Sequence, residues 1–189
     1  MGALLLVVGG AGLVPPARAE DKALLRLHAV TVDLGDPGHA SLGALEIAIE
    51  RWATEEEHEQ LLDTLIEKGS AALLAALQEI KPRAGYIRTS IRPGWDIQYA
   101  REVPFGEGAR RIIIATDRPL NFGEFRNRSR SASYGFILAE IRLTKEGKGV
   151  GKLASMAKVS WNKETRSLEI ENYSNEPVRL TDVEVLGSK

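Results

Sequence analysis

The sequence has no cysteine in its 189 residues, and it has only three histidines and two methionines. Without cysteine the folded chain has no disulfide bond, no thiolate metal ligand and no attachment point for the lipid of a bacterial lipoprotein. A domain of this length must then be stabilised by its hydrophobic core alone.

The few histidines are too scattered for a metal-binding or catalytic cluster. His28, His39 and His58 have no second histidine two or four positions away, which is the spacing that places two ligands on one face of a strand or helix. The sequence also lacks a calcium loop of the D-x-D-x-D-G type and a G-x-S-x-G nucleophile elbow. We therefore predict no metal, no cofactor and no catalytic residue.

A long apolar segment is missing as well. The apolar run at residues 3–13 is shorter than the roughly 20 residues of a membrane-spanning helix. The sequence Ala17-Arg18-Ala19 supplies the small residues that a signal peptidase recognises. Residues 1–19 are predicted to be a signal peptide, with an uncleaved anchor as the alternative because no Lys or Arg precedes the apolar run. Residues 20–189 then form one periplasmic or secreted domain, and the lack of cysteine favours a bacterial source.

Charge is nearly balanced over the whole chain but unevenly distributed along it. The 25 Lys+Arg oppose 26 Asp+Glu, which argues against a nucleic-acid-binding protein. Residues 20–80 contain 4 basic and 13 acidic residues, whereas residues 81–130 contain 11 basic and 5 acidic residues. Two interpretations follow: the two regions pair within the molecule, or the basic region forms a functional surface.

A helical hairpin is predicted near the start of the domain. Thr54 and Glu57 have the spacing of a capping box, in which each side chain bonds the backbone N–H of the other residue. Leucines at helical spacing follow until Gly69, which favours a helix end, and a second leucine-rich stretch runs to Pro82. Residues 54–81 are therefore a helical hairpin, or one helix broken at Gly69.

Alternation of apolar and polar residues predicts about nine strands in the rest of the domain. These segments are residues 25–34, 45–49, 85–89, 95–103, 110–116, 134–144, 150–161, 168–173 and 178–186. Several connections are short enough to join antiparallel neighbours, namely residues 104–108, 145–149, 162–165 and 174–177. The predicted fold is mainly β within the α+β class: an antiparallel barrel or sandwich with the helical hairpin inserted after the second strand.

Arginines and aromatic residues gather in one region, because seven of the eleven aromatics lie between residues 95 and 136. Three arginines there occupy alternate positions in a serine-rich stretch, so an extended backbone projects them to one side. Guanidinium groups bind planar anions and stack on aromatic rings. The candidate ligand-binding residues are Arg118, Arg126, Arg128, Arg130, Trp95 and Tyr99.

Simpler explanations exist for the same residues. By strand alternation Trp95, Ile97 and Tyr99 share a face, which makes core packing the alternative role for the two aromatics. The arginines alternatively form a solvated loop, or pair with the acidic residues of segment 46–67.

Four stretches in this order resemble a group of exported bacterial proteins from soil and environmental bacteria. They are RWATEEE (51–57), GYIRT (85–89), IATDRPLNF (114–122) and ENYSNEPVRLTDV (171–183). The resemblance spans about the whole mature chain and implies a single exported domain. It carries no activity and no functional residue over to this sequence.

Three functions remain, in order of preference. The first is an exported, non-enzymatic binding domain that holds a small anionic or amphipathic ligand at a barrel mouth or sheet face. The second is an envelope structural or protein-interaction module that uses a basic surface to bind a partner protein or an acidic glycan. The third is a hydrolase of unknown type. A large enclosed apolar cavity would favour the first function, and a filled core with a flat basic face would favour the second.

Overall fold

The computed structural model describes residues 23–32, 43–89, 94–118, 136–162, 167–172 and 178–187. These residues form nine strands and two helices. In chain order the elements are β1 (Leu25–Val32), β2 (Gly43–Ile49), α1 (Glu55–Lys68), α2 (Ser70–Glu79), β3 (Gly85–Thr89), β4 (Trp95–Pro104), β5 (Arg110–Thr116), β6 (Phe136–Leu143), β7 (Lys148–Asn162), β8 (Ser167–Asn172) and β9 (Val178–Val185).

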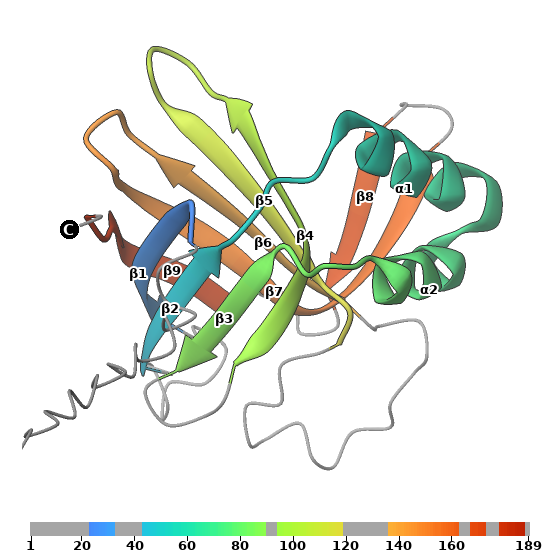
Figure 1. Cartoon of the computed structure of the whole chain (residues 1–189), viewed down its shortest axis with the longest axis horizontal. Helices are drawn as coiled ribbons and strands as arrows, with labels where there is room; N and C mark the ends of the chain where they lie inside the picture. The colour runs from blue at the N-terminus through green and yellow to red at the C-terminus, as the bar shows by residue number, and fades with distance from the viewer. Residues whose placement is uncertain are drawn as a thin grey trace, which may run out of the picture.

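Eight of the strands close into an antiparallel barrel (Figure 1). Strands β1 to β6 pair in sequence order with their neighbours, β6 pairs with β7, β7 with β9, and β9 returns to β1. Every described pairing is antiparallel. The prediction of a mainly antiparallel β fold with a helical hairpin after the second strand is confirmed, and a closed barrel replaces the sandwich alternative.

Strand β8 lies outside this closed ring and pairs with the second half of β7. Ala157 of β7 pairs with Phe136 of β6 and also with Asn172 of β8, so β8 lies on the edge of β7 opposite β6. Strand β9 pairs with the first half of β7, residues 148–153. The prediction that residues 174–177 join two antiparallel neighbours is wrong, because β8 and β9 both pair with β7 and do not pair with each other.

Aliphatic side chains fill the barrel interior. Alternate residues of each strand point inward, and on β1 this gives a strictly alternating pattern of buried and half-buried residues. The largest fully buried side chains are Leu27, Leu45, Ile47, Ile49, Ile87, Ile97, Ile112, Ile114, Ile137 and Ile141. The described strands therefore surround a packed core and not a ligand cavity.

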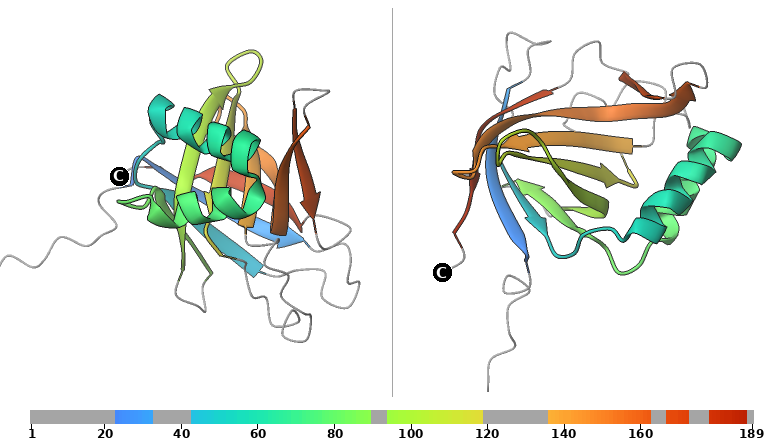
Figure 2. Two further views of the ribbon diagram at one scale, coloured as in Figure 1. Left: turned by 90° about the vertical axis from the view of Figure 1, so that its right-hand side faces the viewer. Right: turned by 90° about the horizontal axis from the view of Figure 1, so that it is seen from above.

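The helical hairpin forms a second layer against one side of the barrel (Figure 2). Leu61 and Leu65 of α1 and Leu73 and Leu77 of α2 are buried, and their spacing of four places each pair on one helix face. They pack on the outward side chains of the neighbouring strands, namely Tyr99, Ala115, Ala154 and Val159. The predicted capping box is also confirmed.

A β-bulge in β4 changes which aromatic residues share a face. Ile97 pairs with Thr116 of β5, and Tyr99 pairs with Ala115. The two β4 residues are two positions apart, whereas their partners on β5 are adjacent. The extra residue reverses the alternation, so Ile97 points into the barrel core and Tyr99 packs beneath the helices. The expectation that Trp95, Ile97 and Tyr99 share one face is wrong for Tyr99, since Trp95 packs against the barrel core.

Candidate functional site

The candidate ligand-binding residues do not form one cluster in the described structure. Arg126, Arg128 and Arg130 lie outside the described residues. The Arg118 side chain is 59% exposed, and its Nε lies 3.6 Å from a carboxylate oxygen of the adjacent Asp117. Trp95 and Tyr99 pack in two separate hydrophobic clusters, as the core-packing alternative predicted.

Several arginines of the basic segment form ion pairs, and apart from Asp96 the partner carboxylates belong to the acidic segment. Such cross-strand and helix-to-strand pairs neutralise the outer surface of β1 to β4. The closest N–O distances are 3.0 Å for Arg83–Glu50, 2.7 Å for Arg83–Asp96, 2.8 Å for Arg88–Glu46 and 3.0 Å for Arg101–Glu55. The prediction of intramolecular pairing is confirmed for these arginines.

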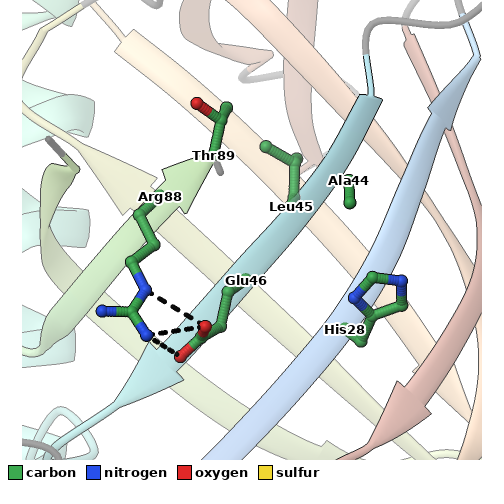
Figure 3. A pocket seen from close by; sticks show the side chains of 6 residues that line it. All are labelled: His28, Ala44, Leu45, Glu46, Arg88 and Thr89. Atoms are coloured by element: carbon green, nitrogen blue, oxygen red, sulfur yellow. Dashed lines mark hydrogen bonds and ion pairs between the residues drawn. The ribbon is translucent and has the colours of Figure 1, made fainter. Parts of the chain in front are cut away.

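An open pocket of about 430 Å³ is bordered by residues of β1, β2 and β3 (Figure 3). It is lined by His28, Ala44, Leu45, Glu46, Arg88 and Thr89. Glu46 stands opposite His28 on one side and opposite Arg88 on the other, and its carboxylate accepts two-pronged hydrogen bonds from the Arg88 guanidinium. The pocket thus offers an imidazole beside a preformed ion pair.

A second polar cluster joins α1 to the barrel. The Tyr99 hydroxyl lies 2.9 Å from Nδ1 of His58, and the Arg101–Glu55 ion pair flanks them. Burial, followed by the positive charge of Arg101, lowers the pKa of His58, and burial raises the pKa of the Tyr99 hydroxyl. Both groups are therefore held in their neutral forms at neutral pH.

Two pairs of like charges stand directly opposite each other on the outer surface of β5, β6, β7 and β9. Arg111 of β5 pairs in register with Arg142 of β6, and Lys152 of β7 pairs with Arg179 of β9. We call these four residues the basic wall. Each alternates along its strand with buried residues, which are Ile112, Ile141, Leu153 and Leu180, so the four side chains lie on the outer side of the barrel. Arg142, Lys152 and Arg179 are exposed, whereas Arg111 is half-buried and its Nε is buried without a hydrogen-bond partner in the described residues.

The basic wall is incompletely neutralised. Glu140 lies 2.7 Å from Arg142 and also stands opposite Lys152 in register. Among the described residues, no carboxylate lies within ion-pair distance of Arg111, Lys152 or Arg179. Phe105 lies beneath both guanidinium groups, 5.9 Å from that of Arg111 and 5.0 Å from that of Arg142. Phe105 is 41% exposed and the neighbouring Val150 is 58% exposed. The surface combines cations with exposed apolar area.

Sequence analysis located only part of this surface. The count of basic residues directed attention to segment 81–130, which contains Arg111, whereas Arg142, Lys152 and Arg179 lie after it. The pairing of β5 with β6 and of β7 with β9, which are well separated in the sequence, brings the four together. No local pattern in the sequence encodes that register.

Other classes of site find no support in the described part of the chain. No three His, Asp or Glu side chains there converge closely enough to bind a metal ion, and no helix there is both long and apolar enough to span a bilayer. No protein-family model, curated protein or solved structure matches the chain. The resemblance to exported bacterial proteins stays a prediction.

Proposed function

We propose that this protein is an exported, non-enzymatic interaction domain that binds an anionic macromolecule through the basic wall. The observation that carries the proposal is the pair of like-charge contacts, Arg111 opposite Arg142 and Lys152 opposite Arg179. Like charges directly opposite in a sheet destabilise the fold. In the wall, Glu140 stands opposite Lys152, but in the described strand pairings Arg111 and Arg179 have no carboxylate as a register partner. Arg83 and Arg88 elsewhere form ion pairs with carboxylates, and a bound anion would supply the missing negative charge beside Arg111 and Arg179.

The filled barrel favours a surface function over an internal one. The interior positions carry fully buried leucines and isoleucines, and an eight-stranded barrel has room for either packed side chains or one small ligand. An outer barrel surface with cations and exposed apolar area suits a macromolecular partner better.

Retention on heparin–agarose tests the proposal. The chain has a net charge of −1, so retention at neutral pH and low salt requires a local concentration of positive charge. We expect the wild type to be retained and to elute with salt, and K152E/R179E to pass through the column. K68E/K81E is the matched control: it makes the same charge change at exposed residues away from the wall and should elute like the wild type. Equal elution of the two variants would contradict the proposal.

A small-ligand site on β1 to β3 is the second candidate, and the open pocket there favours it. Within the described residues, no hydrogen-bond partner is found for the His28 imidazole, although it lines the pocket beside the Glu46–Arg88 pair. A small polar anion such as citrate is the ligand class proposed here, which would hydrogen-bond the imidazole and compete with the Glu46 carboxylate for the Arg88 guanidinium. Thermal shift of wild type and His28→Ala in citrate, phosphate, sulfate and fatty-acid series tests it: stabilisation restricted to the wild type supports the site, and equal responses contradict it.

A further inference from the structure

Helix α1 carries a row of carboxylates on the face directed away from the barrel. Glu56, Glu59, Asp63 and Glu67 are all exposed, and their spacing of three, four and four residues places them along one line on the helix. The buried Leu65 lies on the opposite face. No described cation forms an ion pair with any of the four carboxylates. We call these four residues the acidic stripe.

The acidic stripe and the basic wall match in length and in charge. The stripe covers eleven residue steps, or about 16 Å at 1.5 Å per residue. The wall crosses four neighbouring strands, β5, β6, β7 and β9, or about 14 Å at roughly 4.8 Å between strands. Four carboxylates in a line thus match a surface of four cations, in which Glu140 is bonded to Arg142 and stands opposite Lys152.

Within one molecule the acidic stripe and the basic wall cannot contact each other. Leu61 and Leu65 hold the opposite face of α1 against the barrel, so the stripe points away from the strands that carry the wall. The complementary surfaces are thus both presented outward by the same chain. Because charge complementarity is the feature that selects partners at polar interfaces, a second copy of the chain is the occupant that the geometry favours.

We propose that the acidic stripe of one copy docks on the basic wall of another copy. This inference rests on the proposed function, since it names the anionic partner of the same wall. The contact is heterologous, because it joins two different surfaces, and a pair of copies retains one free wall and one free stripe for further copies unless the assembly closes. Val150, exposed beside the wall, adds apolar contact to the charge pairs.

Sedimentation velocity of the chain at several protein concentrations tests the inference. We expect concentration-dependent association at low ionic strength, and its loss near 1 M salt, where the screening length falls to about 3 Å. Two charge-reversed variants, K152E/R179E in the wall and E59K/D63K in the stripe, should each sediment as a monomer. Circular dichroism melts of both variants check that they fold like the wild type.

Mixing the two variants separates this contact from any other. An equimolar mixture of K152E/R179E and E59K/D63K should associate, because each variant then supplies the surface that complements the other. The single chain carrying all four substitutions should also self-associate. A wild type that stays monomeric at low salt, or a mixture that stays monomeric, would overturn the inference.

Heparin retention distinguishes this failure from failure of the proposed function. E59K/D63K leaves the wall intact and should be retained on heparin–agarose even when it no longer self-associates. If the wild type is retained but never associates, the wall binds some other anion and only the second-copy inference is overturned. If the wild type is not retained, the proposed function itself is contradicted.

Discussion

Nδ1 of His58 on helix α1 lies 2.9 Å from the hydroxyl oxygen of Tyr99 on strand β4. The two rings are also stacked, with centroids 6.2 Å apart. In the tautomer that carries its proton on Nε2, Nδ1 accepts the hydrogen bond from the tyrosine hydroxyl. Protonation of Nδ1 reverses the donor and acceptor of this bond and places a positive charge in a partly buried site near Arg101. The hydrogen bond is one of the polar links that fix the helical hairpin to the barrel, in addition to the leucine cluster beneath it.

Stability should therefore depend on pH through His58. Burial lowers the pKa of His58 below its ordinary value of 6.5. As the pH falls, His58 is therefore protonated in the unfolded chain at a higher pH than in the folded chain. The stabilisation is complete above the unfolded pKa and declines as the pH falls through about 6.5 toward the lower folded pKa. We expect the melting temperature to fall between about pH 7 and pH 5, and His58→Gln to show a smaller fall. His28→Gln is the control, and an equal pH dependence in wild type and His58→Gln would contradict the prediction.

Thr54→Ala should destabilise the protein by about 1 kcal/mol. The Thr54 hydroxyl accepts a hydrogen bond from the Glu57 N–H at 3.2 Å, and the Glu57 carboxylate accepts one from the Thr54 N–H at 3.1 Å. The substitution leaves a backbone donor at the start of α1 without its side-chain acceptor. Urea denaturation measures the change, and Thr64→Ala in the middle of the helix is the control expected to have little effect.

Local patterns in the sequence predicted most elements of the fold. The capping pair Thr54–Glu57 and the leucine spacing defined the hairpin of α1 and α2, and period-two alternation located all nine strands. These signals act within a few residues of each other, so one sequence suffices to detect them. They also limited the fold class, because short connections favour antiparallel pairing.

Features set by contacts distant in the sequence were not predictable. The bulge between Ile97 and Tyr99 depends on how β4 matches β5, and it reverses the direction of every following side chain. The pairing of both β8 and β9 with β7, and the meeting of Lys152 with Arg179, likewise depend on register across strands. The candidate arginines were chosen by proximity in the sequence, whereas the basic wall is a neighbourhood in space.

Gly85→Ala should destabilise the barrel by about 1–3 kcal/mol, the range for overpacking in a close-packed region. Gly85 at the start of β3 is buried. An added Cβ would overlap the carbonyl oxygen of Ala48 on β2. Backbone atoms held in a sheet cannot move aside as a flexible side chain does. Gly187→Ala, where an added Cβ meets nothing within 4 Å, is the control, and equal melting temperatures of the two variants would refute the explanation.

Arg83→Lys should destabilise the protein although it keeps the charge. The Arg83 guanidinium donates two hydrogen bonds of 3.0 Å to Glu50 and one of 2.7 Å to Asp96, and it stacks 5.2 Å from the centre of the Tyr86 ring. A lysine ammonium has neither the planar fork nor the stacking surface that these contacts use.

The side chain is 38% exposed, so we expect a loss of only about 1 kcal/mol, in the range for networked pairs near a surface. Arg83→Met should cost more, because it also leaves two carboxylates without their cation. Arg118→Lys is the matched control, since that side chain makes one ion pair at 3.6 Å and its replacement should leave the free energy of unfolding unchanged. Urea denaturation at low salt ranks the three variants, and a result in which Arg83→Lys equals the wild type would show that the charge alone, and not the guanidinium geometry, stabilises this part of the barrel.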